Sequence, residues 1–174
     1  HTQTKTHTFI RGGIMLKIDL IVLGKIKEKY LNEAIDEYKK RISRFASLNI
    51  VELKDRDKPD KLSDAELDKI IDEESEEILT KIDEESFVIT LEIAGKLLTS
   101  EEFADEIKNV SVRGYSKITL IIGGSNGFNK KVSSKADLKL SFGRMTMNHK
   151  LMRVVLMEQV FRGFKIINNE VCLL

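Results

Sequence analysis

The chain has 174 residues, 41% of them hydrophobic, which is enough for one domain with a sizeable buried core. Its single cysteine, Cys172, excludes an intrachain disulfide, and no apolar run is long enough to cross a bilayer, so we expect a cytoplasmic protein with no membrane partner. The formal net charge is only +1, but the charges are unevenly distributed. Residues 52–106 carry 20 acidic and 7 basic side chains, whereas residues 117–170 carry 3 acidic and 10 basic ones. This asymmetry indicates either a polyanionic partner or two solvated helical surfaces.

The order of the apolar runs predicts an α/β fold. Residues 1–14 lack the apolar core of a secretory signal, so we expect an N-terminal extension or expression leader there and a single domain over 15–174. Apolar runs without polar alternation predict buried strands at 16–23, 48–53, 87–91, 118–122 and 138–142. Helical spacing of apolar residues predicts helices at 26–45, 63–82, 100–114 and 148–167. This alternation is typical of a mainly parallel sheet with helices on both faces.

Two loops follow predicted strands at the sheet edge where such folds bind ligands. In the first loop, Gly123, Gly124 and Gly127 present bare backbone directly after a strand. These glycines are either tight-turn residues or a contact surface for a flat, nucleoside-like ligand. Their spacing matches neither the dinucleotide-binding motif nor the P-loop, so the motif alone does not decide between the two interpretations.

The second loop leads into the last predicted helix, which carries two residues with chemical potential. His149 is either a general base or a polar residue that caps or borders the helix. Arg153 lies among apolar residues and keeps its charge, so it must contact a carboxylate, a carbonyl or an anionic substrate. One alternative is a pair with Glu158 of a neighbouring subunit or with another acid. Glu158 could instead pair with Arg162, four residues later. The apolar surface of this helix is wide, which suggests a homodimer interface.

The sequence contains no pattern typical of a metal site or a serine hydrolase. Of the three histidines, His1 and His7 lie in the expected extension, which leaves His149 alone, and Cys172 has no neighbouring ligand. No nucleophile elbow is present. We therefore expect neither a bound metal nor a Ser-His-Asp triad.

Four segments, in order and in register from about Leu16 to Glu170, match one family. They are LKIDLIVLGKIKEKY (16–30), FVITLEIAGKLL (87–98), LIIGGSNGF (120–128) and LSFGRMTMNHKLMRVVLMEQVFRGFKI (140–166). The chain resembles the SPOUT-class bacterial large-subunit rRNA pseudouridine N3-methyltransferases, the RlmH family. Gly-Gly-x-x-Gly together with Thr-x-x-His-x-x-x-Arg makes the resemblance specific, although each motif alone is weak.

The resemblance implies a C-terminal trefoil knot, a homodimer and S-adenosylmethionine (SAM) as cofactor. It also implies methylation of N3 of a pseudouridine in 23S rRNA within the assembled 70S ribosome. By position, Arg153 would be needed for activity, and His149 is a candidate proton acceptor. The implied cofactor contacts, including the glycine loop, are Leu91, Gly123, Gly124, Gly127, Phe142, Gly143, Arg144, Met145, Thr146 and Met147.

Two departures from the family pattern keep other interpretations open. The family normally ends in a Tyr-His-Lys-like tail that reaches the active site, whereas this chain ends in Val-Cys-Leu-Leu over residues 171–174. The family commonly has proline before the histidine of the second loop, where this chain has Asn148. The alternatives are a catalytically impaired SPOUT module that binds SAM or the ribosome, and a generic nucleotide-binding α/β protein.

Overall fold

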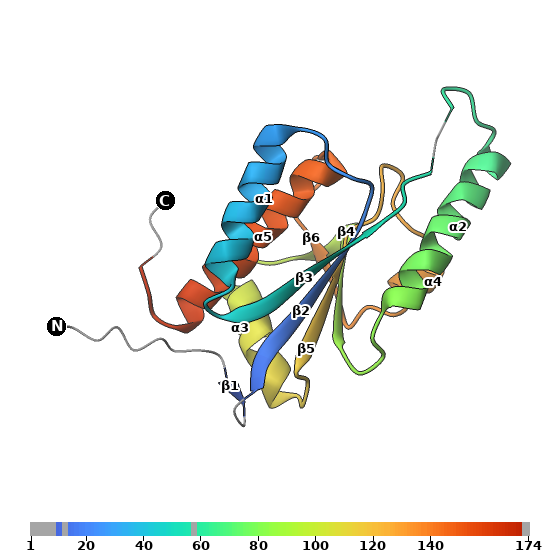
Figure 1. The fold of residues 1–174 in the computed structure, drawn as a ribbon. Helices are drawn as coiled ribbons and strands as arrows, with labels where there is room; N and C mark the ends of the chain where they lie inside the picture. The colour runs from blue at the N-terminus through green and yellow to red at the C-terminus, as the bar shows by residue number, and fades with distance from the viewer. Residues whose placement is uncertain (1–9, 12–13, 57–58, 172–174) are drawn as a thin grey trace.

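The computed structural model describes residues 10–11, 14–56 and 59–171, and its centre is a parallel β-sheet (Figure 1). Five strands form this sheet in the order β3–β2–β5–β4–β6. They are β2 (Ile14–Leu23), β3 (Ala46–Leu53), β4 (Phe87–Leu97), β5 (Lys117–Ile121) and β6 (Leu138–Ser141). The predicted mainly parallel α/β architecture is confirmed.

The described part of the N-terminal segment adds one short strand. β1 (Ile10–Arg11) pairs antiparallel with residues 14–15 at the start of β2. It lies inside the segment 1–14 that we assigned to an extension, and residues 1–9 and 12–13 of that segment lie outside the described part of the chain. The assignment of an extension or leader therefore stays a prediction.

Helices cover both faces of the sheet, as the sequence predicts (Figure 1). On one face lie α1 (Lys29–Ile42), α3 (Ser100–Val112) and α5 (His149–Ile167), with α5 packed against both of the others. On the other face lie α2 (Asp64–Lys81) and the one-turn α4 (Lys130–Ser133). Helix α4 was not predicted, because four residues are too few to show a helical period.

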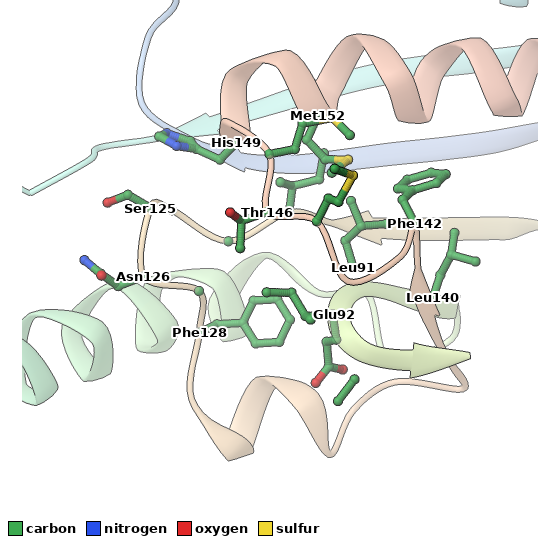
Figure 2. A pocket seen from close by; sticks show the side chains of 18 of the residues that line it. Leu91, Glu92, Ser125, Asn126, Phe128, Leu140, Phe142, Thr146, His149 and Met152 are labelled. Atoms are coloured by element: carbon green, nitrogen blue, oxygen red, sulfur yellow. The ribbon is translucent and has the colours of Figure 1, made fainter. Parts of the chain in front are cut away.

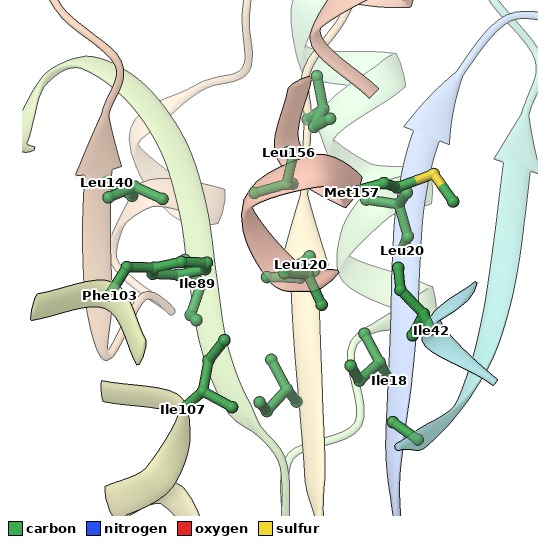
Figure 3. Packing of buried hydrophobic residues seen from close by; sticks show 14 of the residues in the cluster. Ile18, Leu20, Ile42, Ile89, Phe103, Ile107, Leu120, Leu140, Leu156 and Met157 are labelled. Atoms are coloured by element: carbon green, nitrogen blue, oxygen red, sulfur yellow. The ribbon is translucent and has the colours of Figure 1, made fainter. Parts of the chain in front are cut away.

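Two hydrophobic cores hold the layers together, one on each face of the sheet. Ile18 and Leu20 of β2 enter the larger core, which α1, α3 and α5 cover, because alternate residues of a strand point to opposite faces. Figure 3 shows Leu156 of α5 in the same core. Ile21 enters the smaller core, where Ile78 of α2 packs against it. Complete burial of each such side chain stabilises the fold by about 1.5–3 kcal/mol.

Candidate functional site

A cavity of about 490 Å³ opens at the carboxyl ends of β5 and β6, beside residues 91–94 of β4 (Figure 2). All of these strands are parallel, so the loops that follow them meet at one edge of the sheet. The wall combines residues 91–94, residues 122–128, most of the segment 140–147, and two residues of α5, His149 and Met152. The two loops that the sequence singles out therefore form a single pocket of the size that holds a small molecule.

The glycine loop turns tightly where it lines this cavity. The Gly127 N–H donates to the Gly124 carbonyl at 3.0 Å, and Gly127 has a positive φ of 76°. A Cβ on Gly123 would lie 2.8 Å from the carbonyl carbon of Gly127, closer than real Cβ atoms approach backbone. Both interpretations of the motif thus have support, because the glycines make a tight turn and the same backbone forms the cavity wall.

A bulge in β4 builds the opposite wall. Leu91 and Lys96 both pair with Leu140 of β6, so the residues between them leave the ladder and protrude into the cavity wall. Gly95 allows the strand to return, since a Cβ there would lie 2.8 Å from the carbonyl carbon of Leu140. The apolar run predicts that this strand ends at Leu91, and the structure corrects the end to Leu97 because pairing resumes after the bulge.

One buried hydroxyl connects the β4 bulge to the second loop. Ser141, at the end of β6, is 4% exposed. Its Oγ donates to the Ile93 carbonyl at 2.9 Å and accepts the Gly143 N–H at 3.1 Å. Two walls of the cavity are therefore held at a fixed separation by a single side chain.

The second loop supplies most of the predicted cofactor contacts. Phe142, Gly143, Met145, Thr146 and Met147 line the cavity, as do the other predicted positions in β4 and the glycine loop. Arg144 is exposed and lies outside the cavity wall. Because Arg144 stands between two lining residues, its backbone follows the rim while its side chain does not form part of the wall. The assignment of these residues to cofactor binding stays a prediction.

His149 lies at the point where the second loop becomes α5. It is half-buried and lines the cavity. The cap of α5 is Asn148, whose Oδ1 accepts the N–H groups of Lys150 at 2.9 Å and Leu151 at 3.4 Å. His149 is therefore a residue of the cavity rim and not the helix cap.

Arg153 lies one turn further along α5 and outside the cavity wall. It is 2% exposed, and its Nη2 donates to the Leu23 and Gly24 carbonyls, each at 2.6 Å. Its Nη1 donates to Glu52 at 3.3 Å. Burial lowers the pKa of Arg153, and the Glu52 carboxylate opposes that shift. The guanidinium thus ties α5 to the ends of β2 and β3.

The structure also shows which ion pairs Arg153 and Glu158 form and how the apolar surface of α5 is buried. The carboxylate that pairs with Arg153 is Glu52, whereas Glu158 pairs with Arg162 at 2.7 Å within the helix. The wide apolar surface of α5 is largely accounted for by one chain, because α5 packs against α1, α3 and the sheet. A homodimer interface is not needed to bury most of this surface, although Leu151 stays 41% exposed.

Nine residues of the cavity wall were not predicted as site residues: Glu92, Ile93, Ala94, Ile122, Ser125, Asn126, Phe128, Leu140 and Met152. The acid and glycine of the segment Leu-Glu-Ile-Ala-Gly interrupt an apolar strand, and that interruption is the signal that could have indicated a bulge. Phe128 and Leu140 carry no such signal, because an apolar residue next to a strand is equally typical of the core.

Within 10–11, 14–56 and 59–171, no group of three or more His, Cys, Asp or Glu side chains could hold a metal ion. In the same part of the chain, no helix is long and apolar enough to span a membrane.

Comparisons with known proteins point to one family. Residues 16–171 match the family model described as "Predicted SPOUT methyltransferase". A ribosomal RNA large subunit methyltransferase H from Carboxydothermus hydrogenoformans is 51% identical over 155 residues, which cover 89% of this chain and 98% of the relative. The protein of the same name from Streptococcus pneumoniae strain CGSP14 is 49% identical over 151 residues, 87% of this chain and 95% of the relative.

A solved structure shares the fold at low sequence identity. A probable methylase family protein from Haemophilus influenzae Rd KW20 superimposes with a TM-score of 0.50 and 15% identity, covering 87% of this chain and 68% of that one. At this identity the likeness concerns the fold alone.

Proposed function

Because the chain belongs to the SPOUT methyltransferase family, we propose that it uses SAM to methylate N3 of a pseudouridine in 23S rRNA of the assembled 70S ribosome. The names of the relatives, which are about 50% identical, support RNA of the large ribosomal subunit as the substrate. The observation that carries the proposal is the cavity at the carboxyl edge of the sheet, which the glycine loop and the second loop build together. The family also supports a trefoil-knotted C-terminal segment and a cytoplasmic location.

The cavity suits an adenosyl cofactor in shape and chemistry. The backbone at Gly123 leaves a flat surface that even one Cβ would disturb, while Leu91, Phe142 and Met152 offer apolar contacts. SAM, when bound, supplies a methyl group that is already activated by the attached sulfonium. The proposed contacts are the predicted positions that line the cavity, and Arg144 would act at the rim.

His149 and Arg153 are the side chains that we assign to the reaction. The imide N3 of pseudouridine carries a weakly acidic proton, and His149 is placed at the cavity rim where it would accept that proton. Arg153 would hold the first turns of α5 in place through its bonds to the end of β2, and so fix the direction of His149. Arg153 lies outside the cavity wall and is held by the Leu23 and Gly24 carbonyls, so its positive charge would act on the developing imide charge through the electrostatic field and not by direct contact.

The surroundings of the cavity support two macromolecular partners. Arg144 is exposed on the rim and Lys150 follows His149, so both are placed to contact RNA phosphates. Met145 and Met147 line the same cavity and are 89% and 40% exposed. Exposed apolar side chains that gather around a site are typical of an interaction surface, and we propose that a second copy of the chain covers them in a homodimer.

A catalytically impaired module is the second candidate. It is favoured by the apolar residues at 171–174, where the family carries a Tyr-His-Lys-like tail. Val171 is exposed, and residues 172–174 lie outside the described part of the chain. Replacement of the last three residues by Tyr-His-Lys discriminates between the candidates. A large gain in methyl transfer would favour impairment, and an unchanged rate would favour an active enzyme as it stands.

The test of the main proposal is methyl transfer itself. Purified protein is incubated with methyl-labelled SAM and 70S ribosomes that lack the modification, and the labelled nucleoside is mapped by nuclease digestion and mass spectrometry. We expect a single N3-methylpseudouridine in 23S rRNA, with less label on protein-free rRNA. Label on a different nucleoside would refute the assigned target, and no label at any ribosome concentration would refute an active enzyme.

A further inference from the structure

One acidic side chain lines the cavity, and nothing in the proposed reaction uses it. Glu92 protrudes from the β4 bulge as the single carboxylate in the cavity wall, which contains no lysine or arginine among its described residues. The rest of the wall is mainly apolar or glycine, with a few neutral polar groups and His149. A half-buried acid in such a place suggests recognition of a ligand group.

Two neutral hydroxyl groups hold this carboxylate in a fixed orientation. The Thr90 hydroxyl donates to one Glu92 oxygen at 2.6 Å, and the Ser133 hydroxyl donates to the other at 2.8 Å. Thr90 is completely buried, so the first of these contacts is shielded from solvent. Figure 2 shows the Glu92 carboxylate directed toward α4, the helix that carries Ser133. Each oxygen keeps a lone pair for a further donor or a cation.

The charge of Glu92 is not balanced within the described part of the chain. Its contacts there are the two hydroxyls, and no lysine, arginine or histidine forms an ion pair with it. A carboxylate held beside apolar walls is less well solvated than one in water, so a nearby cation would be attracted strongly. The cavity therefore favours a ligand that brings a positive charge.

We propose that Glu92 recognises the positive charge of the cofactor, which resides on its sulfonium and its ammonium group. The inference rests on the proposed use of SAM and adds a residue that the family comparison does not assign. A carboxylate near the sulfonium would also favour release of the product, S-adenosylhomocysteine, because that sulfur is uncharged. Thr90 and Ser133 are then positioning residues, since they act on the ligand only through Glu92.

Isothermal titration calorimetry on the full chain tests this assignment. Wild type, Glu92→Gln and Glu84→Gln are each titrated with SAM, S-adenosylhomocysteine and 5′-methylthioadenosine, which lacks both cations. Glu84→Gln removes the same charge from an exposed turn before β4, at the other end of that strand from the cavity. We expect Glu92→Gln to weaken SAM binding by about tenfold, as for loss of a charge-assisted contact. Methylthioadenosine binding and the Glu84→Gln variant should be unaffected.

The pattern across the three ligands decides the outcome. Weakening of SAM alone assigns Glu92 to the sulfonium, and weakening of SAM and S-adenosylhomocysteine together assigns it to the ammonium group. Equal weakening of all three ligands, or of none, would overturn the inference. If wild type binds none of them, the proposed cofactor itself is wrong, which is a different result from wild-type binding that Glu92→Gln leaves unchanged.

A second variant separates charge from folding. Glu92→Asp keeps the negative charge, so it should retain the preference for SAM over methylthioadenosine even if its affinities fall. Thermal melting of each variant shows whether it is folded. If Glu92→Gln does not fold, loss of the SAM preference in folded Glu92→Asp would overturn the inference, and its retention would support it.

Discussion

Replacement of Arg153 should reveal how strongly the end of β2 depends on a residue of α5. In Arg153→Ala, the Leu23 and Gly24 carbonyls both lose a buried charged donor. Each such loss costs about 1–3 kcal/mol, whereas the contact to Glu52 adds little because that acid is 47% exposed. Removal of a buried cation returns part of this cost. We therefore expect the free energy of unfolding to fall by about 2–4 kcal/mol.

Urea denaturation followed by circular dichroism measures this difference, with a matched arginine as control. Arg113→Ala removes a guanidinium that is 44% exposed and pairs with Glu106, so it should cost less than about 1 kcal/mol. Arg153→Lys keeps the charge but cannot reach all three acceptors, and its stability should be intermediate. An Arg153→Ala protein as stable as Arg113→Ala would refute the interpretation of Arg153 as an anchor.

The same variants separate the two roles that we assign to Arg153 in methyl transfer. If the residue acts mainly by holding α5, Arg153→Lys should lose activity in proportion to its loss of stability. If the guanidinium also stabilises charge on the reacting base, a folded Arg153→Ala protein that still binds SAM should lose nearly all methyl transfer. Wild-type turnover by that protein would remove Arg153 from the mechanism.

Two other predictions concern the glycine loop and the C-terminal end of α5. Gly123→Ala places a Cβ 2.8 Å from the Gly127 carbonyl carbon, so the loop must shift. We expect the SAM affinity, measured by calorimetry, to fall at least tenfold. An unchanged affinity would show that this backbone does not shape the site. Glu170→Gln should lower the free energy of unfolding at pH 7 by up to about 1 kcal/mol. Hydrogen bonds from Lys165, and then from Arg44, lower the pKa of Glu170, so this stabilisation is present at neutral pH and is lost as the pH falls through the lowered pKa. Urea titrations should therefore give equal stabilities for variant and wild type at strongly acid pH, and a difference that persists there would contradict the assignment.

Local sequence patterns were sufficient for the strands and long helices. The apolar runs at 16–23 and 118–122 and the helical spacing at 148–167 agree with β2, β5 and α5 to within a few residues. Periods of two and of 3.6 residues are set by the geometry of single elements, so they can be seen without knowledge of the partners. The convergence of the two loops also followed from the parallel order of strands, because the carboxyl ends of such strands share one edge.

The contacts of the charged side chains were decided only by the tertiary structure. Arg153 meets carbonyl groups 129 and 130 residues away, and Glu92 is held by a hydroxyl 41 residues away. Neither the composition nor the periodicity of the sequence predicts these contacts, since they depend on how α5 and α4 pack on the sheet. The β4 bulge is similar, because its size follows from where pairing with β6 resumes. From the sequence alone came the fold class and the position of the pocket, whereas the contacts of Glu92 and Arg153 were determined by packing between distant segments.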